Sequence, residues 1–224
     1  MDFLELAITV MPQLLTGLKN TVLLTALAIA LGIVLGLVLA FSKVYGHGPV
    51  RWIATGYIGL FRGTPLVTQL FIIYFGLSSI GLVLPPFVAA ILGLGLNSAA
   101  FQAEYFHGSI LAVHPGQITG ALALGMSRFK TIKCIVIPQV IRLVIPSWSN
   151  ELISLLKFSS IAYLIQYPEL LFQTRYIASK NFRMFELFII TGILYLGVVL
   201  VISYFLRRFE LRLRIPGLGT GSVF

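Results

Sequence analysis

The amino-acid sequence predicts an all-α transmembrane protein with about five membrane-spanning helices. Hydrophobic residues make up 58% of the 224 residues, and charged residues make up only 10%. A soluble domain carries roughly 25% charged residues, so this chain could not cover a surface that faces water. Several uncharged stretches exceed the roughly 20 apolar residues that a helix needs to cross a bilayer. The lipid bilayer is therefore the expected surrounding of the chain.

The first span lies between Asn20 and Ser42, where the sequence has no charged residue. It contains Gly32 and Gly36 in the GxxxG spacing that allows another helix to approach closely. Glycine is also frequent in membrane helices in general, so both explanations of the pair stay open. We expect the residues before Leu18 to form a short apolar helix along the outer membrane interface.

The second and third spans come from one uncharged stretch, residues 63–103, which is too long for a single helix. The Pro85-Pro86 pair divides it, because proline lacks the backbone donor that a helix interior needs. We place span 2 near residues 66–80, or from about Trp52 onward, and span 3 near residues 87–106.

The start of span 2 reads Arg62-Gly63-Thr64-Pro65. Proline is favoured at the first position of a helix, and threonine is favoured at the capping position before it. We therefore expect Thr64 to be the N-cap and Pro65 the first helical residue. A role of this segment in positioning span 2 against a partner subunit is the functional alternative.

The fourth and fifth spans follow a long polar segment, residues 107–146. Span 4 is placed near residues 148–167 and holds Glu151 and Lys157. Ionisable residues within a membrane usually face a protein interior or a cavity, so this helix is not exposed to lipid on all sides. We expect Glu151 to brace the polar segment. Span 5 is placed near residues 185–206.

Five spans put the two ends of the chain on opposite sides of the membrane, and cytoplasmic loops carry an excess of Lys and Arg. With the N-terminus outside, the inner segments hold eleven basic residues: Lys43, Arg51, Arg62, Arg128, Lys130, Lys133, Arg142, Arg207, Arg208, Arg212 and Arg214. The outer segments then hold four: Lys19, Arg175, Lys180 and Arg183. The asymmetry predicts a multi-pass protein of the cytoplasmic (inner) membrane with its N-terminus outside and its C-terminus in the cytoplasm.

This topology explains the net charge of +9 without nucleic acid as a partner. The basic residues are too sparse, and too separated by apolar runs, to form a stripe that follows phosphates. His47, His107 and His114 lack metal-ligand spacing, so we expect no metal site. The segment GLGTGS at residues 217–222 lacks the lysine of a phosphate-binding loop, so we expect no cofactor in this chain.

One face of span 3 carries polar residues at membrane depth. Asn97, Phe101 and Glu104 are spaced i, i+4, i+7 and so share a helical face. Polar groups at this depth cost free energy unless they face a cavity or a partner. We expect the face to line a translocation path, with Asn97 hydrogen-bonding the substrate and Glu104 attracting a cationic group. A structural ion pair between Glu104 and Arg62 is the alternative.

A second polar group lies in span 4. Lys157 could hold a substrate carboxylate, with Ser159 and Ser160 beside it in the path, or it could pair with an acid on another helix. The long stem of Lys157 could equally extend to the membrane interface.

The polar segment itself predicts a helix–turn–helix on the inner face. Residues 119–124 are small and apolar and suit one short helix, which Gly125 can end with a positive φ. Ser127 is a plausible N-cap of a second helix, and Pro138 and Pro146 restrict how that helix continues. A small-residue tip of this kind suits docking into another protein.

Motifs in a fixed order carry a resemblance over most of the chain, from about Lys19 to Glu210. They are RGTPLVTQLF with YFG at 62–76, NSAAF with Glu at 97–104, GQ, ALALGMS and IPQ within 116–139, and SNEL, K, SS and AY within 149–163. The chain resembles the permease subunits of bacterial ABC importers for polar amino acids, and most of all the histidine and arginine permeases.

The resemblance implies a type I ABC importer-like fold in one transmembrane domain, residues 1–224. It also implies that the chain is the pore-forming subunit of an ATP-driven importer of a polar amino acid, with a lean toward basic ones. The implied partners are a second permease chain, identical or different, two ATPase subunits that hold ATP and Mg²⁺, and an extracytoplasmic amino-acid-binding protein. The chain itself is then no enzyme.

In that family the inner loop supplies a coupling helix that sits in a groove of the ATPase. The resemblance assigns this role to Thr119, Gly120, Ala121, Leu124, Gly125 and Pro138. The acidic residue of the family's Glu-Ala-Ala motif is absent here, so one contact to the ATPase is expected to differ. Phe158 and His107 also depart from the family pattern, which leaves the amino acid open.

Other classes of membrane protein fit the sequence less well than an importer subunit. A stand-alone secondary transporter or channel is the alternative, although five spans without an inverted repeat argue against it. An intramembrane enzyme would need a catalytic pair at depth, yet the sequence has a single aspartate, Asp2. A membrane anchor that recruits a cytoplasmic protein would tolerate changes in the polar residues of spans 3 and 4.

Overall fold

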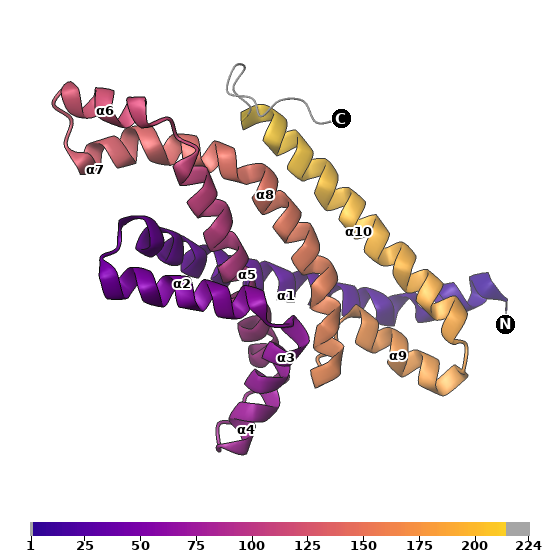
Figure 1. Cartoon of the computed structure of the whole chain (residues 1–224). Coiled ribbons are helices and arrows are strands. Elements are labelled where there is room, and N and C mark those ends of the chain that lie inside the picture. Colours follow the sequence, from indigo (N-terminus) through magenta and orange to yellow (C-terminus); the bar gives the residue numbers. More distant parts are fainter. Residues whose placement is uncertain (1, 214–224) are drawn as a thin grey trace.

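The computed structural model describes residues 2–213, and its secondary structure is helical (Figure 1). The long helices are α1 (Phe3–Tyr45), α5 (Pro86–Leu111), α8 (Ile137–Phe158) and α10 (Met184–Leu213). The shorter ones are α2 (Gly48–Gly63), α3 (Leu66–Phe71), α4 (Leu77–Ser79), α6 (Pro115–Ala123), α7 (Arg128–Thr131) and α9 (Leu170–Asn181). π-helical turns occupy Ile72–Gly76 and Ile132–Val136, and a 3₁₀ helix occupies Ser159–Ile165. The all-α prediction is confirmed.

Helix α1 is one continuous helix of 43 residues, which at 1.5 Å per residue is about 65 Å long. The prediction of a separate interfacial helix before Leu18 is therefore wrong. The reason lies in packing: Leu6, Val10 and Leu14 recur every four residues and are buried against α9 and α10. That buried row stabilises the helix well beyond the uncharged stretch that begins at Asn20.

Helices α1 and α5 pack closely through the two glycines of the first span. A methyl group at Gly32 would overlap the side-chain amide of Gln102. One at Gly36 would lie 3.0 Å from Gln102 Cβ and 3.1 Å from the carbonyl oxygen of Ala99. The packing explanation of the glycine pair is thus confirmed, because only residues without a side chain permit this approach.

Span 2 differs from its prediction, because α2 and the α3–α4 segment are bent by 107° at a short break. Thr64 has φ −116° and ends α2, while Pro65 is the N-cap of α3, which begins at Leu66. The expected roles of Thr64 and Pro65 are therefore wrong by one position. The pyrrolidine ring drives the preceding residue into extended backbone, so the chain turns at Thr64 instead of starting a helix there.

Within the described residues, α1, α5 and α10 are each long and apolar enough to cross a membrane, and the bent α2–α4 pair adds a fourth segment. Helix α8 lies alongside α5 and α10 (Figure 1) and is less apolar because it carries Arg142, Glu151 and Lys157. It covers only residues 148–158 of the predicted fourth span (148–167), because the α-helix begins earlier, at Ile137, and ends at Phe158, where the 3₁₀ helix Ser159–Ile165 follows. The helical path that begins at residue 128 continues through Pro138 and Pro146, although we expected both prolines to restrict it.

The π-helical turn explains why Pro138 does not end the helix. Pro138 is the second residue of α8, which directly follows the π-helical turn Ile132–Val136. A π turn already replaces i→i−4 hydrogen bonds with longer ones, so the missing donor of proline interrupts no regular bond there.

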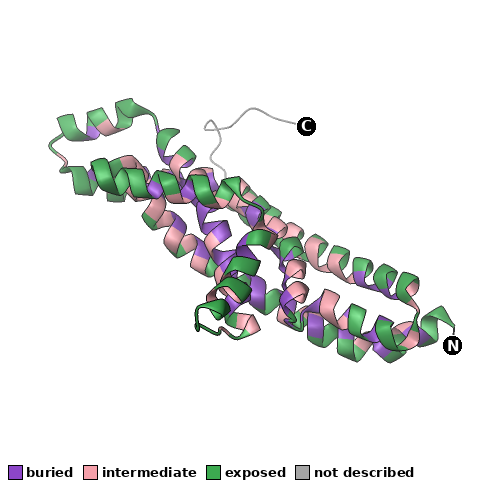
Figure 2. Ribbon diagram, turned by 60° about the horizontal axis from the view of Figure 1, so that its bottom comes forward, coloured by how far each residue is buried: buried purple, intermediate pink, exposed green. Residues whose placement is uncertain are grey.

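Four clusters of buried apolar residues hold the described helices together, two of them large, and buried and exposed faces alternate along the helices (Figure 2). One large cluster joins α1, α3, α5 and α8 around Leu24, Leu70, Leu94 and Leu155. The other joins the first half of α1 to α9 and α10. Helices α3, α5 and α8 and the start of α10 are thus all packed against the same long helix, α1.

Candidate functional site

The first polar cluster lies where α2 ends and α3 begins. Asn97 on α5 donates from Nδ2 to the Phe61 carbonyl (3.2 Å) and to Gln69 Oε1 (2.9 Å). Gln69 donates from Nε2 to the Phe61 carbonyl (2.8 Å) and to Thr64 Oγ1 (2.7 Å). The last carbonyls of a helix have no partner within it, so these two amides satisfy the open end of α2 at membrane depth.

Asn97 is therefore engaged with protein groups, through an amide whose nitrogen has two hydrogens to donate. Its partner Gln69 is a further functional candidate, which we did not identify from the sequence. A glutamine five residues after a threonine that precedes proline is the signal that could have identified it. The cluster fixes the angle at which α3 leaves α2.

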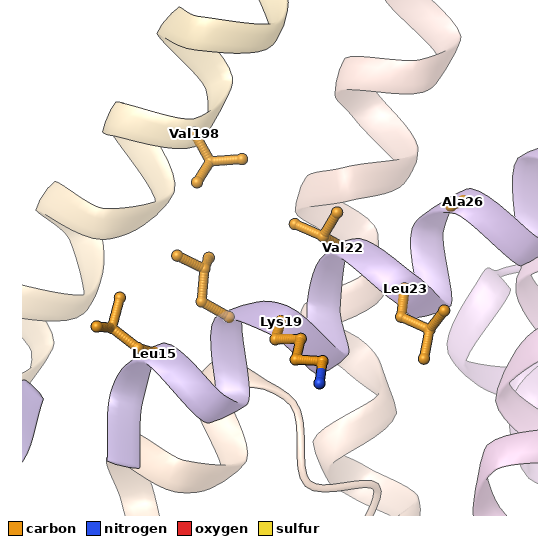
Figure 3. Close-up of a pocket in the computed structure, with 7 residues that line it drawn as sticks. Leu15, Lys19, Val22, Leu23, Ala26 and Val198 are labelled. Carbon is orange, nitrogen blue, oxygen red and sulfur yellow. The ribbon is translucent and has the colours of Figure 1, made fainter. Parts of the chain in front are cut away.

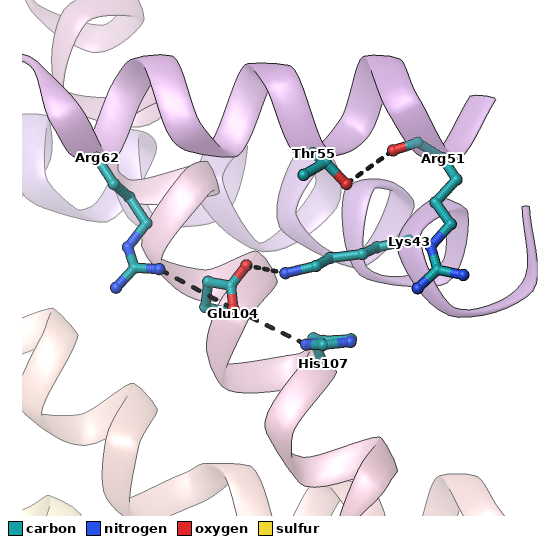
Figure 4. Close-up of polar contacts among 6 residues, drawn as sticks. All are labelled: Lys43, Arg51, Thr55, Arg62, Glu104 and His107. Carbon is teal, nitrogen blue, oxygen red and sulfur yellow. Dashed lines mark hydrogen bonds and ion pairs between the residues drawn. The ribbon is translucent and has the colours of Figure 1, made fainter. Parts of the chain in front are cut away.

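The second cluster surrounds Glu104 near the far end of α5 (Figure 4). Its carboxylate is hydrogen-bonded to Lys43 of α1, and it lies 3.9 Å from Arg62 Nη1 of α2 and 3.8 Å from His107 Nδ1. The guanidinium of Arg62 also lies 5.4 Å from the centre of the Phe101 ring. The structure thus contains the predicted Glu104–Arg62 pair and adds Lys43 as the nearer partner. One carboxylate joins α1, α2 and α5.

The side chains of Lys157, Ser159 and Ser160, at the end of α8, do not pair with one another. Ser159 Oγ donates to the Leu156 carbonyl and Ser160 Oγ donates to the Lys157 carbonyl, each at 2.7 Å. Both hydroxyls therefore satisfy the end of the helix. Lys157 is exposed and has no ion-pair partner among residues 2–213.

Glu151 does not brace the polar segment, contrary to the prediction. It is buried within α8, where Oε1 accepts a 2.6 Å hydrogen bond from Ser98 and Oε2 a 3.5 Å bond from Tyr105. Gln102 Nε2 in turn donates to Ser98 Oγ (3.0 Å) and to the Ile29 carbonyl (3.4 Å). This chain of bonds links α1, α5 and α8. These bonds depend on how the three helices pack together, so the spacing of residues within α8 alone could not predict them.

The polar segment forms the helix–turn–helix that the sequence predicts. Helix α6 ends at Ala123, Gly125 has φ +80°, and Ser127 caps α7 by accepting from the backbone N–H of Lys130 at 3.3 Å. Ala121 is buried inside the hairpin, and Met126 N–H bonds to its carbonyl at 3.1 Å. The turn is thus closed by its own backbone.

The tip of this hairpin lies between α6 and α7 in Figure 1. Leu124 is 85% exposed and Phe129 is 76% exposed. Thr119, Gly120 and Pro138 are also exposed. Phe129 was not singled out from the sequence, although an aromatic residue two positions after the N-cap of a predicted exposed loop is a usable signal. Exposed apolar side chains of this size commonly mark a protein contact.

Comparison with known proteins decides the family. Residues 32–215 match the family described as the binding-protein-dependent transport system inner membrane component. The chain belongs to this permease family. The glutamine transport system permease protein GlnP of Escherichia coli (strain K12) is 36% identical to the permease over 206 residues, which cover 91% of this chain and 94% of GlnP.

The arginine transport system permease protein ArtQ of Bacillus subtilis (strain 168) is 35% identical over 204 residues, 91% of the permease and 93% of ArtQ. A crystal structure of an amino acid ABC transporter with histidines superposes with a TM-score of 0.89 at 38% identity, covering 95% of the permease and 99% of that chain. An inward-facing MetNI methionine transporter shares the fold at TM-score 0.75, covering 92% of this chain and 98% of its own, but is only 18% identical.

One buried acid of the permease lies outside the predicted sites. Glu169 caps α9 by accepting from the backbone N–H groups of Leu171 (2.8 Å) and Phe172 (2.6 Å), and it accepts from Tyr195 Oη of α10 at 3.0 Å. Burial raises the pKa of the Glu169 carboxyl to about 7, although these hydrogen bonds act in the opposite direction. The acid follows Pro168 in a segment between spans, where sequence pattern alone does not predict burial.

Proposed function

We propose that this permease forms part of the pore of an ATP-driven importer for a polar amino acid. Membership of the inner-membrane component family carries the transport role. The cargo class is supported by the glutamine and arginine permeases to which the chain is similar. A basic amino acid remains our specific expectation, since the SNEL and AY motifs resemble the histidine and arginine permeases.

The partners follow from the same family. A binding-protein-dependent system needs a binding protein, and we propose two ATPase subunits that hold ATP and Mg²⁺ and a second permease chain, identical or different. We propose that the ATPase contacts the hairpin tip through Leu124 and Phe129, with Thr119, Gly120, Ala121, Gly125 and Pro138 shaping or flanking it. The exposed apolar tip supports this, because such side chains are stable in water only at a cost.

For the substrate path we propose the α5 face of Asn97, Phe101 and Glu104 together with Lys157, Ser159 and Ser160. Lys157 is the best candidate for the substrate carboxylate, since it is exposed and has no ion-pair partner within the described residues. Asn97 and Glu104 act in this proposal mainly by fixing α2 and α3 around the path, because their polar atoms are bonded to those helices and to α1.

We also propose that the N-terminus lies outside the cytoplasmic membrane and the C-terminus inside. The basic residues near the α6–α7 hairpin and the end of α10 support this orientation; Arg214 among them lies outside the described residues. Family membership argues against a stand-alone secondary transporter or channel.

Purification of the permease with its partners tests the proposal. The wild type, Leu124→Asp and the control Ser179→Asp would be isolated in mild detergent and assayed for ATPase activity, with mass spectrometry of the retained chains. Ser179 is exposed on α9, far from the hairpin. We expect the wild type and the control to retain an ATPase and Leu124→Asp to lose most of it.

Two results would contradict the proposal. If no ATPase accompanies the wild type, the importer assignment fails and a stand-alone transporter becomes the leading reading. If Leu124→Asp retains the ATPase as fully as the control, the hairpin tip is not the docking surface.

A further inference from the structure

An apolar groove lies between α1 and α10, where the two helices diverge (Figure 3). Its volume is about 560 Å³, and six of its seven lining side chains are apolar. Leu15 and Val22 of α1 face Val198 of α10 across the opening. Most residues in the most hydrophobic stretch of each helix are not buried inside the protein, so in a membrane the groove would face lipid or a neighbouring chain.

Lys19 is the single charged residue of the lining. Its side chain is exposed, its ammonium nitrogen lies on the α1 side of the groove away from Val198, and it has no ion-pair partner among residues 2–213 (Figure 3). It also stands at the end of the uncharged segment 20–42. A lysine at the end of a membrane segment places its ammonium at the level of the lipid headgroups.

The lining favours a lipid over a protein segment. Apart from Lys19, the groove offers no side chain that could bond the N–H and C=O groups of an inserted loop, and such groups are costly in apolar surroundings when unsatisfied. An acyl chain has no polar groups to satisfy. A positive charge beside an apolar trough therefore matches the phosphate and the acyl chains of one lipid molecule.

We propose that the groove between α1 and α10 binds an anionic phospholipid, with Lys19 at its phosphate and the acyl chain against Leu15, Val22, Leu23 and Val198. The site requires only that the chain spans a membrane, and it stands or falls separately from the proposed cargo and partners. In the orientation proposed above, the lipid belongs to the outer leaflet.

Lipid retained by the purified transporter provides the test. The full complex would be isolated in mild detergent as wild type, Lys19→Ala, Ala26→Phe and the control Lys180→Ala, and titrated with phosphatidylglycerol or phosphatidylcholine while bound lipid is counted by native mass spectrometry. Lys180 is an exposed lysine of α9 outside the groove. Ala26→Phe keeps the charge but fills the trough.

We expect Lys19→Ala to lower phosphatidylglycerol binding about fivefold, the effect of one lysine near an anionic headgroup. Ala26→Phe should lower the binding of both lipids, Lys180→Ala should leave both unchanged, and inorganic phosphate should not displace the lipid. Equal binding of phosphatidylglycerol by wild type and Lys19→Ala would overturn the proposal. Unchanged binding by Ala26→Phe, with each variant eluting as a single species, would show that the lipid binds elsewhere and would likewise overturn the proposal.

Discussion

At the scale of single residues, charged side chains from different helices gather in small clusters. Glu104 has three basic neighbours from α1, α2 and its own helix. The carboxylate and its Lys43 partner are each about one-fifth to one-quarter exposed, so solvent screens the pair only in part. The cluster therefore contributes to holding three helices together as well as to the local charge.

A double-mutant cycle separates a structural role of Glu104 from a substrate role. Glu104→Ala leaves the Lys43 ammonium without its partner, so we expect a loss of about 1 kcal/mol in stability. In the Lys43→Ala background the same change should cost less. Thermal unfolding in detergent measures both. If Glu104 instead binds substrate, Glu104→Ala will weaken substrate binding equally with and without Lys43.

We expect Glu169 to make the stability of the permease dependent on pH. The pKa of its carboxyl is raised from 4.5 to about 7 by burial, so the folded chain holds a proton that the unfolded chain has released above pH 4.5. Stability from this group is complete below the unfolded pKa and is lost as the pH rises through the folded pKa near 7. The difference amounts to roughly 3 kcal/mol across that window.

We therefore compare wild type with Glu169→Gln, which keeps an acceptor for α9 but cannot ionise. Between pH 5 and pH 7.5 the melting temperature of the wild type should fall relative to the variant, as followed by intrinsic fluorescence on heating. Two parallel curves would show that Glu169 has the same pKa in the folded and unfolded chains.

At the scale of helices, the bonds from Gln102 through Ser98 to Glu151 fasten α8 to α5 and α1. Because the helical path of α8 runs back through the π turn to the hairpin tip, these bonds lie on the segment that joins the proposed ATPase contact to the membrane. Buried hydrogen bonds to a carboxyl group are worth more than exposed ones.

Ser98→Ala removes the shortest bond to Glu151 and should lower stability by about 2 kcal/mol, because the carboxyl is left short of a donor. In the Glu151→Leu background the same substitution should have little effect. Denaturation of the four proteins in detergent gives the coupling energy, with Ser179→Ala as an exposed serine control. Additive losses would mean that the two side chains do not interact in the folded protein.

The helices could largely be predicted from the sequence, because hydropathy and proline mark where spans begin and end. Gly125 and Ser127 were also predictable, since turn and cap chemistry is local. Pro65 is a local signal for a break at Thr64, but the angle of the bend and the full length of α1 could not be predicted. The angle depends on side-chain amides from α3 and α5, and the length of α1 depends on contacts with apolar residues far along the chain.

The site was predicted unevenly for the same reason. The Glu104–Arg62 pair followed from charge and depth, and the structure contains it. The bonds of Asn97 to the end of α2 were not foreseen, and Glu151 was assigned to the wrong partner, because each depends on which helices become neighbours. The roles of the path and coupling residues in transport remain predictions.

At the scale of the whole molecule, the long helix α1 connects the earliest and latest parts of the chain. Gln13 bonds to Gln173 (2.9 Å), Asn20 to the Pro168 carbonyl (2.9 Å) and Thr21 to the backbone N–H of Leu170 (3.1 Å). These contacts span about 150 residues, and the row of Leu6, Val10 and Leu14 is buried by the same region.

This connection has a consequence for biosynthesis. The first helix to leave the ribosome cannot bury its outer half until α9 and α10 have been made. During that interval an apolar row and several hydrogen-bonding groups have only lipid or an insertion factor as neighbours. A chain that stops before α9 would therefore leave this part of α1 without the contacts that bury it.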